Sequence, residues 1–396
     1  MKILFLAPYP PFPPRGGGAL RMFHLIKGLA EQYNVTLLSF APNPAAVQAM
    51  APLRAFCQVV TVPSPAPRRL TQRALTTLAS PLPDLVLRNA SRAYAEALSR
   101  LVAAERFEVV QAASLEMAPY ALQARGLGPL LALDQFNAEY RLQQRAALAD
   151  LRRGALPGGL YSLIQWRKLA RYERSVLRAF DLVSVVSEED RLALERLARR
   201  ARIVVVPNGV ATAQVRPGAV RGDLGAATIV FTATLDYRPN IDAARWFVNE
   251  VLPLIVARRP DARLLLVGRA AGAAVQALAS DQVELVGEVP DVRPYIDGSA
   301  VSVIPMRIGG GSRLKLLEAL AMEAPVVCTP MGAEGVVGLR HGEHLLLARS
   351  PAAFAEAVLG LINDPRLGQV LGRAGRAHVQ AHYDWQLLVP RLMAAY

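Results

Sequence analysis

The sequence predicts an α/β protein with two doubly wound domains. Its beginning reads as strand, helix and strand over residues 2–7, 19–32 and 34–40, the order of a βαβ unit with parallel strands. A second series of apolar strands begins at residue 229, after a stretch rich in turn residues. The chain has 396 residues, which is too long for one ordinary core and suits two.

Further strands are predicted where a short aliphatic run ends at a turn. They are residues 59–62, 109–111, 130–133, 181–186, 264–268, 283–287, 301–304 and 325–328. A long amphipathic helix is predicted over residues 160–180, and we interpret its arginines as a solvated face: Arg167, Arg171, Arg174 and Arg178. The predicted divisions of the chain are residues 1–200, 201–375 and 376–396.

Composition excludes several classes of protein. With 53% hydrophobic and 19% charged residues, the bulk of the chain is not disordered. No apolar run approaches about 18 residues, so we expect no membrane span. The apolar run over residues 3–7 is too short for a signal-peptide core, and we expect a cytoplasmic protein. Cys57 and Cys328 alone make neither a disulfide framework nor a metal site.

The net charge, 45 − 32 = +13, indicates an anionic partner such as a nucleic acid, a membrane surface or a phosphorylated substrate. The basic residues are dispersed and include no nucleic-acid-binding motif, so we expect no nucleic-acid partner. The proline-rich and arginine-rich residues 63–83 are the least regular part of the chain. We favour a surface loop there over an acceptor-side or membrane-facing element.

Gly16, Gly17 and Gly18 follow the first strand and precede a helix, where backbone N–H groups can approach a phosphate or sugar. A dinucleotide fingerprint would need glycine at position 21, which is Arg21, and an acid at the end of the second strand, which ends at Phe40. NAD and FAD are therefore unlikely ligands in this interpretation. A P-loop motif is absent as well.

The most informative stretch is residues 305–320. Glycines 309–311 follow a strand, Ser312 is a candidate N-cap, and Arg313 and Lys315 stand in the first helical turn. Glycine N–H groups, a helix N-terminus and two cations together suit the binding of a diphosphate. Glu318, one helical turn further on, could accept hydrogen bonds from the hydroxyl groups of a ribose. The alternative is an ordinary surface pair of Lys315 with Glu318, but lysine is rare here, with only four in the chain.

The sequence contains no Asp-x-Asp. A nucleotide-diphosphate enzyme of this kind would neutralise its leaving group with cations and helix dipoles, so we expect no metal and no cofactor. Arg238 is a second candidate cation for the same ligand.

The ordered set of motifs resembles the large family of retaining GT-B glycosyltransferases that includes bacterial mannosyl- and glucosyltransferases of polysaccharide assembly. The motifs that carry the resemblance are Gly16 to Gly18, Pro207-Asn208-Gly209, Arg238-Pro239-Asn240, residues 309–321 and residues 325–335.

The resemblance implies two Rossmann-like domains that face each other across a cleft. The first is an acceptor-side domain and the second a nucleotide-sugar-binding domain, and the last helix of the chain crosses back to the first domain. It further implies that Arg313 and Lys315 stabilise the departing diphosphate, that Glu318 holds the ribose, and that Gly16 to Gly18 close over the donor. Gly310 and Gly311 would face the transferred sugar.

Two departures from the family pattern affect these expectations. Gly310 occupies the place where many members have the first of two glutamates, which corresponds to a variant branch with Gly-x-Gly-x-Arg-Leu-Lys. Gln111 lies where many members have a histidine. Glu116, Asn137 and Glu139 are candidates to contact acceptor or sugar, with loop and helix-cap roles as the alternative for the last two.

Our hypothesis from the sequence is a retaining, metal-independent glycosyltransferase that uses a UDP- or GDP-sugar and a polysaccharide or lipid-linked acceptor. Its positive charge would also suit the anionic inner face of the cell membrane. Two alternatives stay open: a nucleotide-sugar 2-epimerase of the same fold, and a non-catalytic protein that binds a nucleotide-sugar or a lipid surface.

Overall fold

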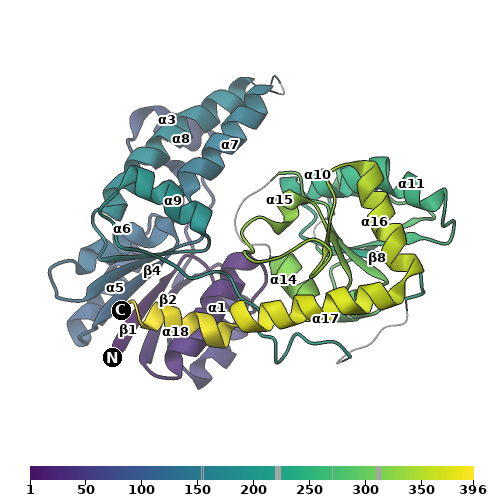
Figure 1. Ribbon diagram of the computed structural model, residues 1–396. Coiled ribbons are helices and arrows are strands. Elements are labelled where there is room, and N and C mark those ends of the chain that lie inside the picture. Colours follow the sequence, from purple (N-terminus) through teal and green to yellow (C-terminus); the bar gives the residue numbers. More distant parts are fainter. Residues whose placement is uncertain (153, 155, 219–223, 270, 309–313) are drawn as a thin grey trace. The chain divides into compact units, whose positions relative to one another are not determined.

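The computed structural model describes residues 1–152, 154, 156–218, 224–269, 271–308 and 314–396 (Figure 1). The chain forms two compact units. Unit 1 comprises Met1–Pro207 together with Leu388–Tyr396, and unit 2 comprises Asn208–Leu387. Each unit is an α/β domain with its own hydrophobic core.

Unit 1 contains a seven-stranded parallel sheet in the order β3-β2-β1-β4-β5-β6-β7. Its strands are β1 (Lys2–Ala7), β2 (Asn34–Ala41), β3 (Gln58–Pro63), β4 (Val109–Ala113), β5 (Leu130–Gln135), β6 (Leu182–Val185) and β7 (Ile203–Val205). The central strands are buried on both faces, as expected of a parallel sheet covered by helices.

Helices connect these strands. They are α1 (Gly17–Ala30), α2 (Pro44–Ala49), η1 (Ala51–Ala55), α3 (Leu70–Ala79), α4 (Asp84–Leu87), α5 (Arg92–Ala104), η2 (Leu115–Met117), α6 (Ala118–Ala121), η3 (Leu122–Ala124), α7 (Glu139–Arg152), α8 (Leu156–Leu177) and α9 (Glu188–Leu197). Local sequence explains where they begin. Ser187, for example, accepts the Asp190 N–H at 3.1 Å and so caps α9.

Unit 2 contains a six-stranded sheet in the order β10-β9-β8-β11-β12-β13, again parallel. Its strands are β8 (Thr228–Thr232), β9 (Arg263–Val267), β10 (Val283–Gly287), β11 (Val301–Ile304), β12 (Val326–Cys328) and β13 (Leu346–Leu347). Its helices are α10 (Arg238–Trp246), η4 (Phe247–Val251), α11 (Leu252–Val256), α12 (Ala273–Gln276), α13 (Arg293–Asp297), α14 (Leu314–Ala321), α15 (Pro330–Ala333), α16 (Pro351–Asn363) and α17 (Pro365–His382). Helix α18 (Trp385–Met393) spans the boundary back to unit 1.

Both sheets have the strand order of a doubly wound fold, which the sequence predicted. In each sheet the order reverses between two central strands, β1 and β4 in unit 1 and β8 and β11 in unit 2. Ligands of such folds bind beyond the carboxyl ends of the strands at this switch point. The loops after β1, β4, β8 and β11 are therefore the places to look for a site.

The structure corrects three expectations. Strand β7 pairs with β6, so the first sheet extends past the predicted boundary at residue 200. Helix α17 runs through residues 375 and 376 without a break, so the predicted division after residue 375 falls within a helix, whereas the last helix begins at Trp385 as expected. Residues 63–83 are not simply a loop, because they include α3.

Two general features complete the fold. Cys57 and Cys328 are both buried and are not joined in a disulfide. No helix in the described part of the chain combines the length and apolar character that crossing a bilayer requires.

Candidate active site

Lys315, in the first turn of α14, lies at the switch point of the sheet in unit 2. Its Nζ donates a hydrogen bond of 2.7 Å to Asn240 Oδ1 and contacts Met306 Sδ at 3.8 Å. The ammonium also lies 4.8 Å from the centroid of the Phe231 ring, a cation–π contact. Phe231 belongs to β8 and Met306 follows β11, so Lys315 stands between the ends of the two central strands.

Asn240 fixes the position of this lysine. Its side chain is buried, and its Nδ2 donates to the Thr234 carbonyl oxygen at 2.8 Å while its Oδ1 accepts from Lys315. Sequence reasoning directed attention to Arg238 and missed Asn240, although both stand in the same Arg-Pro-Asn motif. The structure places Arg238 at the start of α10 with an exposed side chain.

Glu318 follows Lys315 by one helical turn. Burial raises the pKa of its carboxyl to about 7, although the nearby Lys315 acts to lower it. Near neutral pH the group is thus divided between its protonated and ionised forms. A carboxyl in this state can either donate to or accept from a sugar hydroxyl.

The segment that leads into α14 is tied down on two sides. Arg307 pairs with Asp242 of α10 through hydrogen bonds of 3.0 and 3.1 Å, and its guanidinium lies over the Trp246 ring. The Thr329 hydroxyl donates to the carbonyl oxygen of Met306. These contacts hold the loop after β11 against the elements that carry Asn240. Arg313, Gly310 and Gly311 lie outside the described residues, so their predicted roles stay predictions.

In unit 1 the glycine triplet lies at the corresponding switch point. Gly16 has φ 91° and ψ 159° and precedes Gly17, the first residue of α1. This backbone conformation favours glycine. A side chain at Gly18 would overlap the Tyr9 hydroxyl and press against the Phe136 ring. The loop after β1 thus brings exposed backbone close to a tyrosine hydroxyl.

Glu116 lies at the end of the neighbouring strand. It is 2% exposed and pairs with Arg88, whose Nε and a terminal nitrogen lie 2.7 and 2.6 Å from Glu116 Oε2. Burial raises the pKa of its carboxyl, against the opposing effect of Arg88. Ser114, just before it, has φ 73°, a strained conformation for a residue other than glycine.

Glu139 begins α7, after β5. Burial, with a smaller contribution from the negative charge of Glu116, raises the pKa of its carboxyl to about 7, while a hydrogen bond from Asn137 acts to lower it. The first backbone N–H groups of α7 donate instead to Glu173 of α8, at 2.9 and 2.7 Å. Glu173 therefore caps the helix, and the carboxyl of Glu139 is left for another role.

The residue that replaced the third glycine of a dinucleotide motif has a structural role. Arg21 is buried and forms a bidentate pair with Asp134, at 2.8 and 2.6 Å. It also donates to the carbonyl oxygen of Val206 at 2.8 Å. Gln111, which stands where a histidine was expected from the resemblance, is buried within β4 and accepts a hydrogen bond from Tyr396. The two side chains therefore belong to the interior of unit 1.

The described residues include no group of three or more histidine, cysteine or acidic side chains placed to hold a metal ion. What unit 2 offers instead is a fixed ammonium and a carboxyl group of raised pKa at a switch point. Such an arrangement suits a ligand with negative charge and hydroxyl groups.

Comparison with known proteins identifies a family for each part of the chain. Residues 16–209 match the family described as glycosyl transferase 4-like domain, and residues 226–364 match the family described as glycosyl transferases group 1. The two matches together span most of both units. The chain belongs to the glycosyltransferases with the GT-B fold.

Similar proteins include an uncharacterized 44.6 kDa protein in the cps region of Klebsiella pneumoniae, 26% identical over 41% of this chain and 44% of that protein. A GDP-mannose-dependent monoacylated alpha-(1-6)-phosphatidylinositol monomannoside mannosyltransferase of Corynebacterium glutamicum is 31% identical over 36% of this chain and 41% of its own. These alignments span less than half the length of either relative.

Among solved structures, HepE of Anabaena in complex with UDP and glucose superposes with a TM-score of 0.69 at 15% identity, covering 100% of this chain and 98% of that one. At this level of identity the likeness establishes the fold.

Proposed function

We propose that the protein is a retaining, metal-independent glycosyltransferase that moves a hexose from a UDP- or GDP-sugar to a polysaccharide or lipid-linked acceptor. The names of its relatives and neighbours support this choice of nucleotide-sugar donors. The Corynebacterium relative is named for GDP-mannose, and the Anabaena structure holds UDP and glucose.

The observation that carries the proposal is the fixed ammonium of Lys315. When the bond between the sugar and the diphosphate breaks, negative charge builds on the diphosphate and positive charge on the sugar ring. A cation already held in place by Asn240 stabilises that charge without having to reorganise, which is the largest common source of enzymatic rate enhancement.

The rest of the donor site is assigned as follows. Arg313 is proposed to share the diphosphate with Lys315, and Glu318 to hold the ribose. Arg238, exposed at the start of α10, is proposed as a further phosphate contact. Gly310 and Gly311 are proposed to face the sugar.

Unit 1 is proposed to serve the acceptor. The acceptor hydroxyl must give up a proton as it attacks, and two carboxyls of raised pKa, Glu116 and Glu139, lie beyond the ends of β4 and β5. Asn137 and the backbone of Gly16 to Gly18 supply further polar groups in the same part of the unit. A membrane surface of negative charge on the cytoplasmic side is proposed as a partner, in keeping with the net charge of +13.

The proposal is tested by a donor screen. The purified protein is incubated with UDP- and GDP-sugars, with and without lipid-linked and oligosaccharide acceptors, and released nucleotide is measured. Acceptor-dependent release of one nucleotide is expected, with the anomeric configuration of the product the same as that of the donor by NMR. Conversion of UDP-GlcNAc to its 2-epimer without acceptor would identify an epimerase. Tight nucleotide-sugar binding without release across the whole panel would overturn the transferase assignment.

A further inference from the structure

Helix α3 is attached to unit 1 with its polar side inward. Arg73, Thr76 and Thr77 point toward the protein, whereas Leu70, Leu75 and Leu78 are 78%, 68% and 81% exposed. At 100° per residue, Leu70, Leu78 and Leu75 fall within one arc of about 140°, so they form one continuous stripe. We call these three side chains the leucine face. A surface helix ordinarily buries such a stripe, so its exposure requires an explanation.

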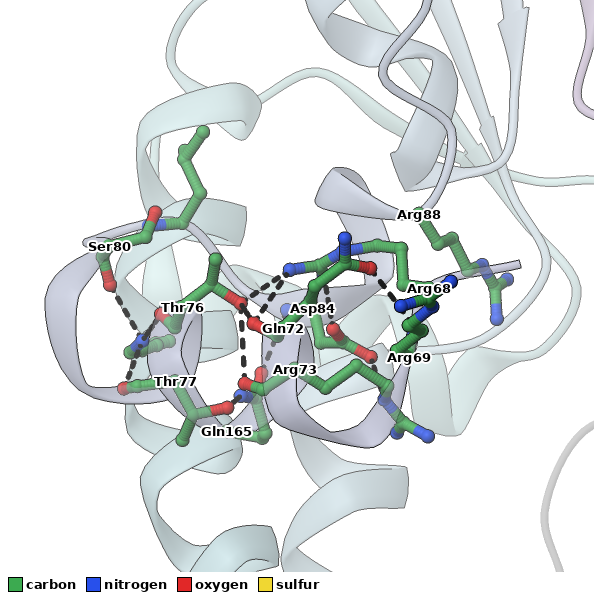
Figure 2. A network of polar contacts seen from close by, with 12 residues as sticks. Arg68, Arg69, Gln72, Arg73, Thr76, Thr77, Ser80, Asp84, Arg88 and Gln165 are labelled. Atoms are coloured by element: carbon green, nitrogen blue, oxygen red, sulfur yellow. Dashed lines mark hydrogen bonds and ion pairs between the residues drawn. The ribbon is translucent and has the colours of Figure 1, made fainter. Parts of the chain in front are cut away.

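The inward side of α3 is held by a specific polar network, shown close up in Figure 2. Arg73 donates to Asp84 at 3.1 Å and to the Tyr161 hydroxyl at 2.9 Å. Gln165 of α8 donates to the Thr77 hydroxyl at 3.0 Å and accepts from the Asp84 N–H at 2.9 Å. These contacts fix the rotation of the helix, and thereby fix the leucine face toward the outside.

Lys168 completes the attachment. Its Nζ donates to the carbonyl oxygens of Thr77 and Ser80 at 2.6 Å each and of Thr76 at 3.2 Å, at the C-terminus of α3. A cation at this position satisfies free carbonyl groups and offsets the helix dipole. Together with the network around Asp84, it makes the outward placement of the leucines a built feature.

Positive charge borders the leucine face. A surface pocket of about 570 Å³ is lined by Leu78, Ser80, Lys168 and Arg171, which places the exposed Arg171 beside one end of the face. Arg69, also exposed, immediately precedes the other end. The sequence has no acidic residue between positions 32 and 83 or between 151 and 172, so α3 and most of α8 contribute only positive charge.

We infer that the leucine face of α3, with its arginine border, docks on an anionic lipid bilayer. Aliphatic side chains that enter the boundary between headgroups and acyl chains, beside cations that meet anionic headgroups, are the combination that such a surface recognises. A second copy of the chain fits less well. A symmetric dimer through this face would bring Arg69 and Arg171 against arginines of the other copy. The inference deepens the proposed function, because it rests on the lipid-side acceptor proposed above and names the surface involved.

The test is flotation with vesicles of phosphatidylcholine alone or mixed with phosphatidylglycerol. We expect the protein to float with the mixed vesicles and not with the neutral ones. Leu75→Gln with Leu78→Gln should weaken binding roughly tenfold or more, because each buried leucine contributes strongly to partitioning. Arg69→Gln with Arg171→Gln should weaken it by about fivefold per cation, which corresponds to ~1 kcal/mol for each basic residue.

The matched control is Leu127→Gln with Leu192→Gln, which changes two exposed leucines elsewhere in unit 1 and should leave flotation unchanged. Circular dichroism melts check that every variant is folded. Equal flotation of the α3 variant and the control would overturn the inference. So would failure of the protein to float, or a dimer in light scattering that only the leucine variant abolishes, which would assign the face to a second copy.

The same proteins are titrated with UDP and GDP in solution. Because the leucine face belongs to unit 1 and Lys315 to unit 2, its variants should bind nucleotide as the parent protein does. Flotation without nucleotide binding would uphold the lipid surface and contradict the proposed function. Nucleotide binding without flotation would contradict the lipid surface and leave the proposed function standing.

Discussion

Arg21 and Lys315 are both cations in the early turns of helices that follow central strands, yet their surroundings differ. Arg21 is buried against a carboxylate and a backbone carbonyl, so its charge is neutralised within unit 1. Lys315 is positioned by a neutral amide, a thioether and an aromatic ring. The buried pairing of Arg21 with a carboxylate suits a role in the fold, whereas the place of Lys315 at the switch point of its sheet suits a role in binding a ligand of negative charge.

The largest effect on stability is expected for the buried pair of Arg21 with Asp134. Asp134→Asn leaves the buried guanidinium of Arg21 without its counter-charge, and should lower the free energy of unfolding by about 3–5 kcal/mol. The exposed pair of Arg92 with Glu96 is the control, where Glu96→Gln should cost about 0.3–0.5 kcal/mol. Urea denaturation followed by circular dichroism measures both. A loss of similar size in the two variants would contradict a structural role for the buried pair.

For Lys315, the second cation of the comparison, we expect an effect on activity. Lys315→Ala should lower turnover by about 10²–10³-fold while leaving the fold intact, because it removes charge stabilisation of the leaving diphosphate. The control is Lys27→Ala, which changes an exposed lysine of α1. Nucleotide release under saturating donor measures the effect. Near-normal turnover of Lys315→Ala would remove this residue from the mechanism.

Asn240 sharpens the comparison as a positioning residue. Asn240→Ala should lower kcat roughly tenfold with a smaller change in KM, because the lysine remains but is no longer held. Asn240→Asp keeps a hydrogen-bond acceptor for Lys315 but neutralises the ammonium, so its turnover should stay low. It also loses the N–H that donates to the Thr234 carbonyl oxygen, so its thermal stability should fall below that of the parent protein. Recovery of turnover in Asn240→Asp would show that the charge of Lys315 matters less than its position.

A further expected effect concerns the dependence of stability on pH. The folded pKa of Glu318, about 7, lies above the value of about 4.3 for an unfolded glutamate, so folding takes up a proton between these values. Its contribution to stability therefore falls as pH rises through this window and levels off above it. Glu318→Gln should flatten that slope in urea titrations at several pH values. Glu139→Gln should likewise reduce the fall of stability with rising pH, because the pKa of Glu139 in unit 1 is also raised to about 7.

Much of the architecture follows from residue patterns, because buried parallel strands read as short aliphatic runs between turns. For example, the sequence predicts strand β8 and the position of Lys315 in the helix that follows β11. Asn240 did not emerge, because its contact joins residues 75 positions apart and leaves no local pattern. Helix α3 was also missed. It lies between proline-rich segments, and its leucines face outward, so nothing in its pattern indicates a helix packed on a core.

The polar attachment of α3 has a consequence for local motion. Separating this helix from α8 would break hydrogen bonds but expose little new apolar surface, because its leucines already face outward. The urea sensitivity of such an opening scales with newly exposed surface, and it should therefore be small. Amide protons of α3 are then expected to exchange with solvent at rates that change little with denaturant, unlike those of α1, whose release would uncover its apolar side.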